Sequence, residues 1–354
     1  MNNPSLSPYF TQTSQWADFW AIANYQAGHQ VHTISVDGQV QYLYQYPYYF
    51  GESFLYAPSS PVFDDAGTTT NDLATYLDAY YSAVIQKASE LDAVFVKTEL
   101  DPIISQRLNI NDNMSGKSAI QSYVHDSAVT IARKRIMYNA AIVLDTSQLL
   151  MPNEEKAPDD TESLKAFFYS NSVFWKKVNA GHRSKTKKSL DQGWQYSVIK
   201  SEENFESFWK LYQSTAQRQT FTTQPREYFQ ALYEKPESRI IVLFDEDSPQ
   251  AVWFGYVSGD SLIYLYGGNT RTSMERYGQY FIHLIALRIC TREKLQTYDL
   301  GGYEPGTGYS VFKERYKGTK IDFFGPYDIV LRPIRYKMLE NIITIAKPIR
   351  RLLK

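Results

Sequence analysis

The stretch YDLGGYEPGTGYSVFKERYKG, residues 298–318, combines five glycines with a Phe312-Lys313 pair inside a basic run. Glycine clusters mark turns or places where the backbone approaches another group closely. The stretch does not match the G-x-G-x-x-G fingerprint, because no glycine follows Gly308 at the required offsets, and no Gly-Lys-Ser/Thr ends it as in a P-loop. Three interpretations remain open: a phosphate cradle, a mobile lid or a turn-rich connector.

Other catalytic residue sets are incomplete. Only His29 and His32 among the five histidines are close in sequence, and no cysteine or carboxylate pair completes a metal set with them. No G-x-S-x-G elbow occurs, and Cys290 lies in an apolar helical stretch that favours a buried, unreactive thiol. The SGKS at 115–118 has Asn111 where a P-loop needs its first glycine. We therefore expect no metal, no cofactor and no covalent intermediate.

Catalysis by positioning and charge stabilisation needs none of these parts. It suits the transfer of an activated acyl group to an amine. The donor already carries a good leaving group, and the amine is already a nucleophile. The protein then has to align the two and stabilise the tetrahedral oxyanion.

Length, composition and charge limit the class of protein that could carry such a site. The chain has 354 residues, enough for about two domains, and 43% of them are hydrophobic. A single cysteine and the lack of an apolar N-terminal stretch predict a cytoplasmic protein. The sequence contains no run of 18 apolar residues, so we expect no membrane-spanning helix. Residues 1–160 hold 8 Lys+Arg and 18 Asp+Glu, a charge of −10, whereas the remainder holds 29 and 20, a charge of +9. A polyanionic partner is expected to meet the second half.

Hydrophobic periodicity predicts alternating helices and strands. Helices are expected within 11–28, 71–99, 165–194, 205–219, 279–295 and 336–354, and strands within 31–58, 92–100, 140–146, 238–270 and 297–302. The hexapeptide GESFLY (51–56) resembles GDSLIY (259–264), and the order of elements around them also repeats, which indicates a duplicated α/β domain. The segment 336–354 is basic and amphipathic, with packing on the core favoured over membrane contact.

The glycine stretch resembles a YDFGG…G…FK block of the Fem-type peptidyltransferases, the FemA, FemB and FemX family. Other blocks follow in family order along nearly the whole chain: FTQTSQWADFW (10–20), YAPSSPVFDD (56–65), HRSKTKKSLDQGW (182–194) and IYLYGGNT (263–270). No long helical arm is inserted in the second half, so the chain is most similar to the short FemX type.

This resemblance implies an α/β (α+β) fold of two tandem GCN5-related N-acyltransferase-like domains, with mixed sheets flanked by helices. Residues 1–148 plus 326–354 would form the first, precursor-binding domain, 163–325 the second, aminoacyl-transferring domain, and 149–162 the connector. The implied activity is transfer of an amino acid from aminoacyl-tRNA to an amine of the peptide stem of a peptidoglycan precursor, which builds an interpeptide bridge. The precursor would be UDP-MurNAc-pentapeptide or lipid II, and contact with the inner face of the membrane stays open.

Family motifs also suggest roles for single residues. Phe312 and Lys313 match the Phe-Lys pair near the transfer centre, where an ammonium can stabilise the oxyanion or the leaving ribose oxygen. Arg183 matches an arginine that grips the diphosphate of the precursor, and Lys187, one helical turn on, would add a second cation. The alternative interpretation of Lys313 is a surface lysine, and that of Arg183 and Lys187 is a solvated charge on a helix.

Further matches lie in the substrate cleft. Asp64 matches an acidic cleft residue, and Tyr264 and Tyr266 match cleft tyrosines, with turn capping and core packing as the alternatives. Two positions depart from the family pattern: Trp20 replaces a phosphate-binding lysine, and Ser59-Ser60 replaces Arg-Gly. These departures leave open whether the acceptor is the nucleotide-linked precursor, a lipid-linked stem or another amine.

Two other functions remain in competition. An acyl-CoA N-acyltransferase of the same fold needs a pyrophosphate loop before the long helix, and Arg276-Tyr277-Gly278 does not have its spacing. A non-catalytic binding relative is the second alternative, motivated by the missing cations.

Overall fold

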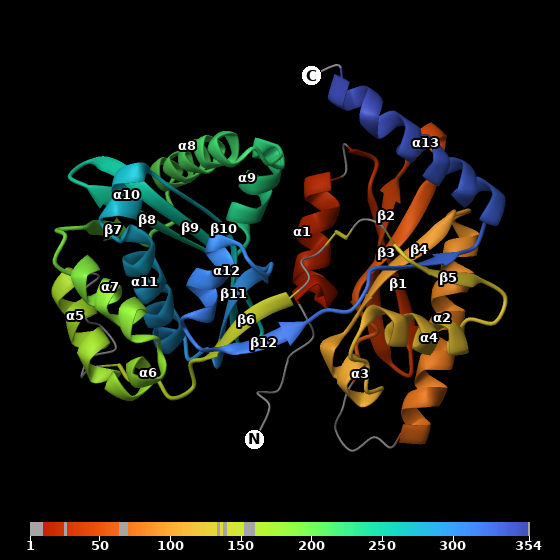
Figure 1. Ribbon diagram of the computed structural model, residues 1–354, viewed down its shortest axis with the longest axis horizontal. Helices are drawn as coiled ribbons and strands as arrows, with labels where there is room; N and C mark the ends of the chain where they lie inside the picture. Colours follow the sequence, from red (N-terminus) through yellow and green to blue (C-terminus); the bar gives the residue numbers. More distant parts are fainter. Residues whose placement is uncertain are drawn as a thin grey trace. The chain divides into compact units, whose positions relative to one another are not determined.

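The computed structural model describes residues 10–24, 27–63, 70–132, 135–136, 140–151 and 160–352. Its contacts divide the chain into two compact units. The first unit comprises Pro8–Asn139 and Asp322–Lys354, and the second is built from Ala140–Ile321. Each unit is a mixed sheet flanked by helices (Figure 1), which confirms the predicted tandem α/β fold.

The first unit contains a six-stranded sheet in the order β1-β2-β3-β4-β13-β5. Its strands are β1 (Gln30–Val36), β2 (Gln39–Pro47), β3 (Ser53–Ser60), β4 (Phe95–Leu100), β5 (Ala128–Ile131) and β13 (Tyr327–Val330). Its helices are α1 (Ser14–Asn24), α2 (Thr70–Glu90), α3 (Pro102–Arg107), α4 (Asn113–Tyr123) and α13 (Pro333–Leu352), with short 3₁₀ turns at Phe10–Gln12 and Tyr49–Gly51.

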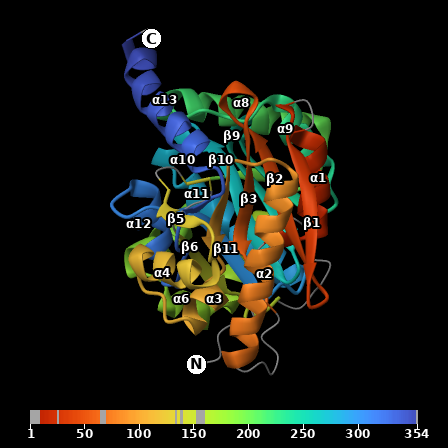
Figure 2. The same ribbon diagram turned by 90° about the vertical axis from the view of Figure 1, so that its right-hand side faces the viewer.

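Helix α2 covers one face of this sheet (Figure 2). Its buried residues recur at helical spacing, as in Leu73, Leu77, Tyr80 and Val84, and form one core with residues of β1 to β4. On the other face, α1 places Trp20 against Tyr44 and Tyr46 of β2. Trp20 is therefore a core residue of this unit.

The second unit contains a seven-stranded sheet in the order β12-β6-β11-β10-β9-β8-β7. Its strands are β6 (Ala140–Asp145), β7 (Gln195–Ser197), β8 (Ser238–Asp245), β9 (Ser248–Ser258), β10 (Ser261–Asn269), β11 (Thr297–Tyr303) and β12 (Thr319–Asp322). Its helices are α5 (Thr161–Ser170), α6 (Ser172–Lys177), α7 (Ala180–Ser189), α8 (Glu202–Gln219), α9 (Arg226–Glu234), α10 (Arg271–Glu275), α11 (Gly278–Arg292) and α12 (Gly308–Glu314).

Helix α11 is the central helix of the second unit. Every residue from Tyr280 to Cys290 is buried, and burial raises the pKa of the Cys290 thiol, as expected for an unreactive cysteine. Helices α8 and α9 pack on the opposite face of the sheet (Figure 1).

The domain boundaries differ from those expected from the sequence. Strand β6 pairs with β11 of the second unit, whereas the boundary expected at 148 assigns this strand to the first domain. Strand β13 returns to the first sheet between β4 and β5. A buried apolar strand can join either sheet. The apolar pattern of its residues therefore does not show to which unit the strand belongs. Residues 152–159 of the expected connector lie outside the described residues.

Candidate functional site

Strands β10 and β11 pair in parallel only over their first residues. The ladder ends at Ile263↔Asp299, although β10 continues to Asn269 and β11 to Tyr303. Both strands are irregular at this point: β10 shifts register against β9 between Tyr264 and Tyr266, and β11 shifts against β6 after Asp299. Such bulges bend a strand and end its pairing. The sheet therefore opens between the two strands where the glycine stretch begins.

Helix α12 carries Lys313 to this opening. Thr307 caps the helix by accepting a hydrogen bond from Ser310 N. Lys313 is only 7% exposed, and its Nζ donates to Gly302 O at 2.6 Å. The same Nζ lies 5.8 Å from the ring centroid of Tyr264 and 5.2 Å from that of Tyr309. The lysine is thus held at the opening by one strand carbonyl and two aromatic rings.

A buried carboxylate accompanies this ammonium. Burial lowers the pKa of Lys313 to about 8, and the charge of Asp299 opposes that decrease. Burial likewise raises the pKa of Asp299 to about 6, although Gly301 N and Lys313 stabilise its charged form. Both groups are therefore mostly charged at neutral pH. An ammonium shielded from water acts strongly on a negative charge that develops beside it.

Phe312 anchors α12 on its inner side. Its ring packs against His182 of α7 and against Tyr280 and His283 of α11. Burial lowers the pKa of both histidines to about 3, so both are neutral. His283 Nδ1 lies 2.6 Å from Tyr298 Oη, which accepts from Trp253 Nε1 at 2.9 Å. A rigid aromatic layer thus supports the helix that presents Lys313.

The two predicted cleft tyrosines lie on opposite faces of the sheet. Tyr264 stacks on Trp253 and contacts His283, beside Lys313. Tyr266 contacts aromatic rings of α8 and α9, and its hydroxyl is 3.2 Å from that of Tyr228. The bulge between the two residues reverses the alternation that would otherwise place them on one face. Of the two, the structure brings only Tyr264 to Lys313.

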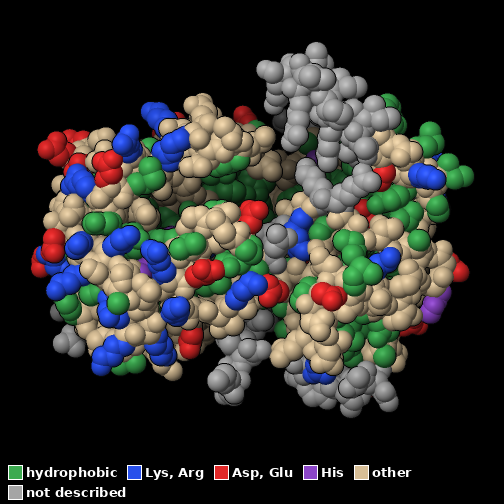
Figure 3. All heavy atoms as spheres, viewed as in Figure 1, with side chains coloured by type: hydrophobic (Ala, Val, Ile, Leu, Met, Phe, Trp, Pro, Cys, Tyr) green, Lys and Arg blue, Asp and Glu red, His purple; other side chains and the backbone are tan. Residues whose placement is uncertain are grey.

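The predicted cations Arg183 and Lys187 lie on α7. Arg183 is half-buried, and its Nη1 donates to Trp175 O at 2.9 Å and Val178 O at 3.2 Å, which ties it to the end of α6. Lys187 is exposed one turn further on. Lys and Arg side chains gather on the surface over α5 to α7 (Figure 3). Asp64, the predicted acidic cleft residue, lies outside the described residues.

Sequence reasoning missed Asp299 and the helical state of residues 308–314. Asp299 lies in the glycine stretch, two residues before Gly301. At this spacing an aspartate side chain often accepts a hydrogen bond from the backbone N–H two residues on. That spacing was the available signal. Thr307 with Ser310 three residues later was a signal for a helix start.

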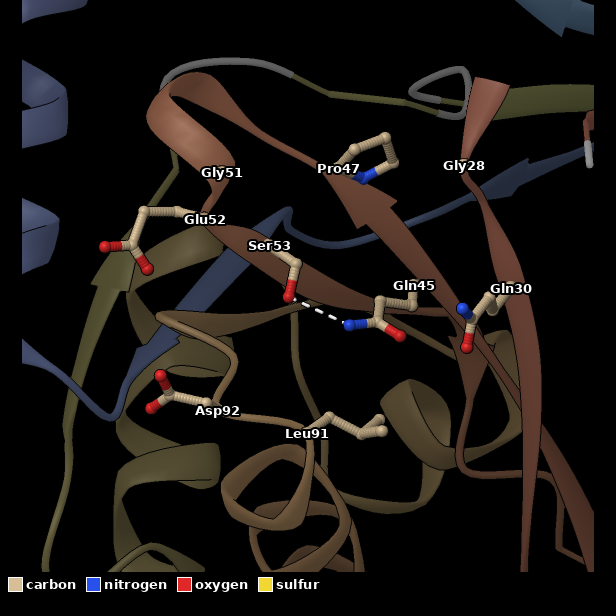
Figure 4. Close-up of a pocket in the computed structure, with 9 residues that line it drawn as sticks. All are labelled: Gly28, Gln30, Gln45, Pro47, Gly51, Glu52, Ser53, Leu91 and Asp92. Atoms are coloured by element: carbon tan, nitrogen blue, oxygen red, sulfur yellow. Dashed lines mark hydrogen bonds between the residues drawn. The ribbon is translucent and has the colours of Figure 1, made fainter. Parts of the chain in front are cut away.

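A separate hollow of about 320 Å³ lies in the first unit (Figure 4). Gln30, Gln45, Glu52, Ser53 and Asp92 are its polar lining residues. Gln45 Nε2 donates to Ser53 Oγ at 2.9 Å, and Glu52 and Asp92 both accept from Arg335 Nη1, which is not a lining residue. None of the residues predicted from the sequence lines this hollow.

Two kinds of feature do not occur among the described residues. Among them, no three His, Cys, Asp or Glu side chains converge to hold a metal ion. No helix in this part of the chain has both the length and the apolar character to cross a bilayer.

Several solved structures share the fold of this chain. The crystal structure of FemX superposes with a TM-score of 0.69 at 13% identity and covers 94% of each chain. A conserved protein of unknown function from Bacteroides thetaiotaomicron has a TM-score of 0.53 at 12% identity, covering 89% of each chain. The C-terminal domain of a putative lysylphosphatidylglycerol synthetase from Agrobacterium fabrum has a TM-score of 0.52 at 10% identity, covering 90% of this chain and 87% of that one. These similarities show the fold.

Sequence comparison adds the family. No curated protein matches the chain. The acetyltransferase (GNAT) domain family matches residues 176–318, which include β10, β11 and Lys313. The FemAB family matches residues 2–245, more than half of the chain. The protein therefore belongs to the FemAB family.

Proposed function

We propose that this protein transfers the amino acid of an aminoacyl-tRNA to an amine of the peptide stem of a peptidoglycan precursor. The observation that carries the proposal is the buried ammonium of Lys313 at the opening between β10 and β11. The residues matched by the acetyltransferase (GNAT) domain family include this opening, and we propose it as the place where the acyl group and the amine meet. We propose that the transfer takes place in the cytoplasm, at the inner face of the membrane if the acceptor is lipid-linked.

The chemistry follows from the groups present. The amine attacks the ester carbonyl, a C–N bond forms, and the carbonyl oxygen becomes an oxyanion. Collapse of this intermediate breaks the ester C–O bond, and the ribose oxygen leaves with a proton while the attacking nitrogen loses one. Lys313 stabilises the negative oxygen in both steps, because its charge is already in place and shielded from water. Tyr264 and Phe312 fix the position of α12 and its lysine.

Precursor binding is proposed for the cationic surface of α7. Lys187 is exposed and available to a diphosphate, whereas one nitrogen of Arg183 is engaged by backbone carbonyls. Trp20 is buried in an aromatic cluster, so its position contributes packing where a lysine would contribute charge. Trp20 and Ser59-Ser60 stand where the family carries cations. Whether the protein accepts UDP-MurNAc-pentapeptide or lipid II would depend on which other residues bind the precursor in their place.

The start of α11 argues against acyl-CoA as the donor. Arg276 lies 4.3 Å above the Trp194 ring and pairs with Asp245, so its guanidinium is already engaged. A Cβ on Gly278 would lie 2.1 Å from Ser273 Oγ, which shows that Gly278 allows α10 to pack closely. Arg276 and Gly278 therefore stabilise the packing around the start of α11. Their presence does not require a bound pyrophosphate.

Replacement of Lys313 tests the proposal. The variant Lys313→Met should lower turnover with aminoacyl-tRNA by about 100-fold or more, since one oxyanion-stabilising group typically contributes that much. Lys317→Gln, an exposed neighbour in the same basic run, is the control and should stay within about twofold of the parent. Unchanged turnover in Lys313→Met would refute the role assigned to Lys313.

A further inference from the structure

Asp299 lies on β11, three residues before the glycine whose carbonyl accepts the bond from Lys313. Its side chain is 5% exposed, and its Oδ1 accepts from Gly301 N at 2.7 Å. Gly301 has a φ of +72°, and a Cβ there would lie 2.4 Å from Tyr264 O and 3.9 Å from Lys313 Nζ. The next carbonyl, Gly302 O, accepts the bond from Lys313. One short path of contacts therefore joins the Asp299 carboxylate, the turned backbone and the ammonium.

The other titratable groups around Lys313 come from three elements. Tyr264 on β10 and His283 on α11 are buried, and Tyr309 stands on α12 itself. Burial raises the pKa of Tyr264 to about 12 and lowers that of His283 to about 3, so both are neutral near pH 7. Burial also raises the pKa of Tyr309. Asp299 is the acidic member of this set.

We infer that Asp299 is a positioning residue that fixes both the place and the charge of Lys313. Its hydrogen bond holds the turn at Gly301 that aims the Gly302 carbonyl at Lys313. Its negative charge keeps the desolvated lysine protonated, which an isolated buried ammonium would resist. The inference rests on the proposed function, in which the charge of Lys313 stabilises the reacting oxygen.

The substitution Asp299→Asn separates charge from structure. Asparagine has the same shape and an oxygen that can still accept from Gly301 N, but it carries no charge. Because the Asp299 charge raises the pKa of Lys313, its loss lets Lys313 deprotonate at lower pH. We expect the midpoint of Lys313 titration to fall by about one pH unit or more. The alkaline limb of the kcat/KM profile should move by the same amount.

Trace acetic anhydride labelling measures this titration directly. The acetylated Lys313 peptide would be quantified by mass spectrometry between pH 6 and 10, in parallel with kcat/KM. Asp145→Asn is the matched control: Asp145 also accepts from a backbone N–H two residues on, Ser147 N at 3.0 Å, but lies exposed on β6. Its variant should leave both profiles in place. Asp299→Glu keeps the carboxylate and should keep the alkaline limb near its parental pH even if the rate falls.

The outcomes distinguish this inference from the proposed function. A lowered rate with an unmoved Lys313 midpoint in Asp299→Asn would overturn the inference and leave aminoacyl transfer standing. A shifted midpoint in a parent protein that transfers no amino acid would support the coupling and refute the proposed function. If Asp299→Asn does not fold, an alkaline limb displaced in Asp299→Glu would also overturn the inference.

Discussion

Lys313 and Asp299 are two buried, electrostatically coupled groups whose burial costs stability. Both groups are buried, and burial shifts the pKa of each toward its neutral form. Removing one member of a buried pair leaves an uncompensated charge, whereas replacing both members is often neutral or stabilising. Because apolar side chains would serve packing as well, the buried charges agree with the proposed role of Lys313 toward a substrate.

Denaturant unfolding of two variants tests this explanation. At pH 7.5, Lys313→Met should lose about 2 kcal/mol of unfolding free energy, and the double variant with Asp299→Asn should recover to within about 1 kcal/mol of the parent. At pH 5 the Asp299 carboxylate, whose pKa is about 6, is mostly protonated, so the deficit of Lys313→Met should vanish. An equal deficit at both pH values would show that Asp299 carries no charge that Lys313 compensates.

Sequence reasoning reached the residues of this site unevenly. Phe312 and Lys313 could be selected because they form a motif that is contiguous in sequence. The spacing of Asp299 and Gly301 could mark a turn, but it could not show the relation of Asp299 to Lys313, which depends on α12 bringing a lysine 14 positions later back to β11. Tyr266 stays a prediction, but the structure places it away from Lys313.

At the scale of elements, the opening between β10 and β11 forms the candidate site. It depends on Gly301, whose backbone conformation and close approach to Tyr264 O both exclude a side chain. The bulge was invisible in the sequence, because alternation of side chains assumes an uninterrupted strand. Helix α12 was also missed, since its seven residues are too few for a periodic apolar pattern.

Two glycines of the same stretch provide a matched test. Gly301→Ala should cost about 2–4 kcal/mol of stability and lower turnover more than tenfold, because a methyl group would displace the Tyr264 carbonyl. Gly308→Ala, in open space at the start of α12, should be neutral or stabilise by up to about 1 kcal/mol. Denaturant unfolding and steady-state rates of both variants measure this. Equal effects would contradict the account of the opening.

At the scale of the molecule, two similar units make up one chain. The hexapeptides GESFLY and GDSLIY lead into β3 and β10, and each of these strands pairs in parallel with the next strand of its sheet. The duplicated fold was predictable because helix and strand patterns recur in order. The unit boundaries were not, because β6 pairs with the sheet of the second unit and β13 with that of the first. The acidic and basic halves of the chain favour a polyanion at the second unit.

The most direct measurement is a transfer assay with competing donors. The protein and its Lys313→Met variant would receive tRNA charged with labelled Gly, Ala or Ser, or labelled acetyl-CoA, with UDP-MurNAc-pentapeptide and lipid II offered in parallel. The account predicts label from aminoacyl-tRNA on one of the two precursors, lost in Lys313→Met. Label from acetyl-CoA alone, or no transfer from any aminoacyl-tRNA, would contradict it.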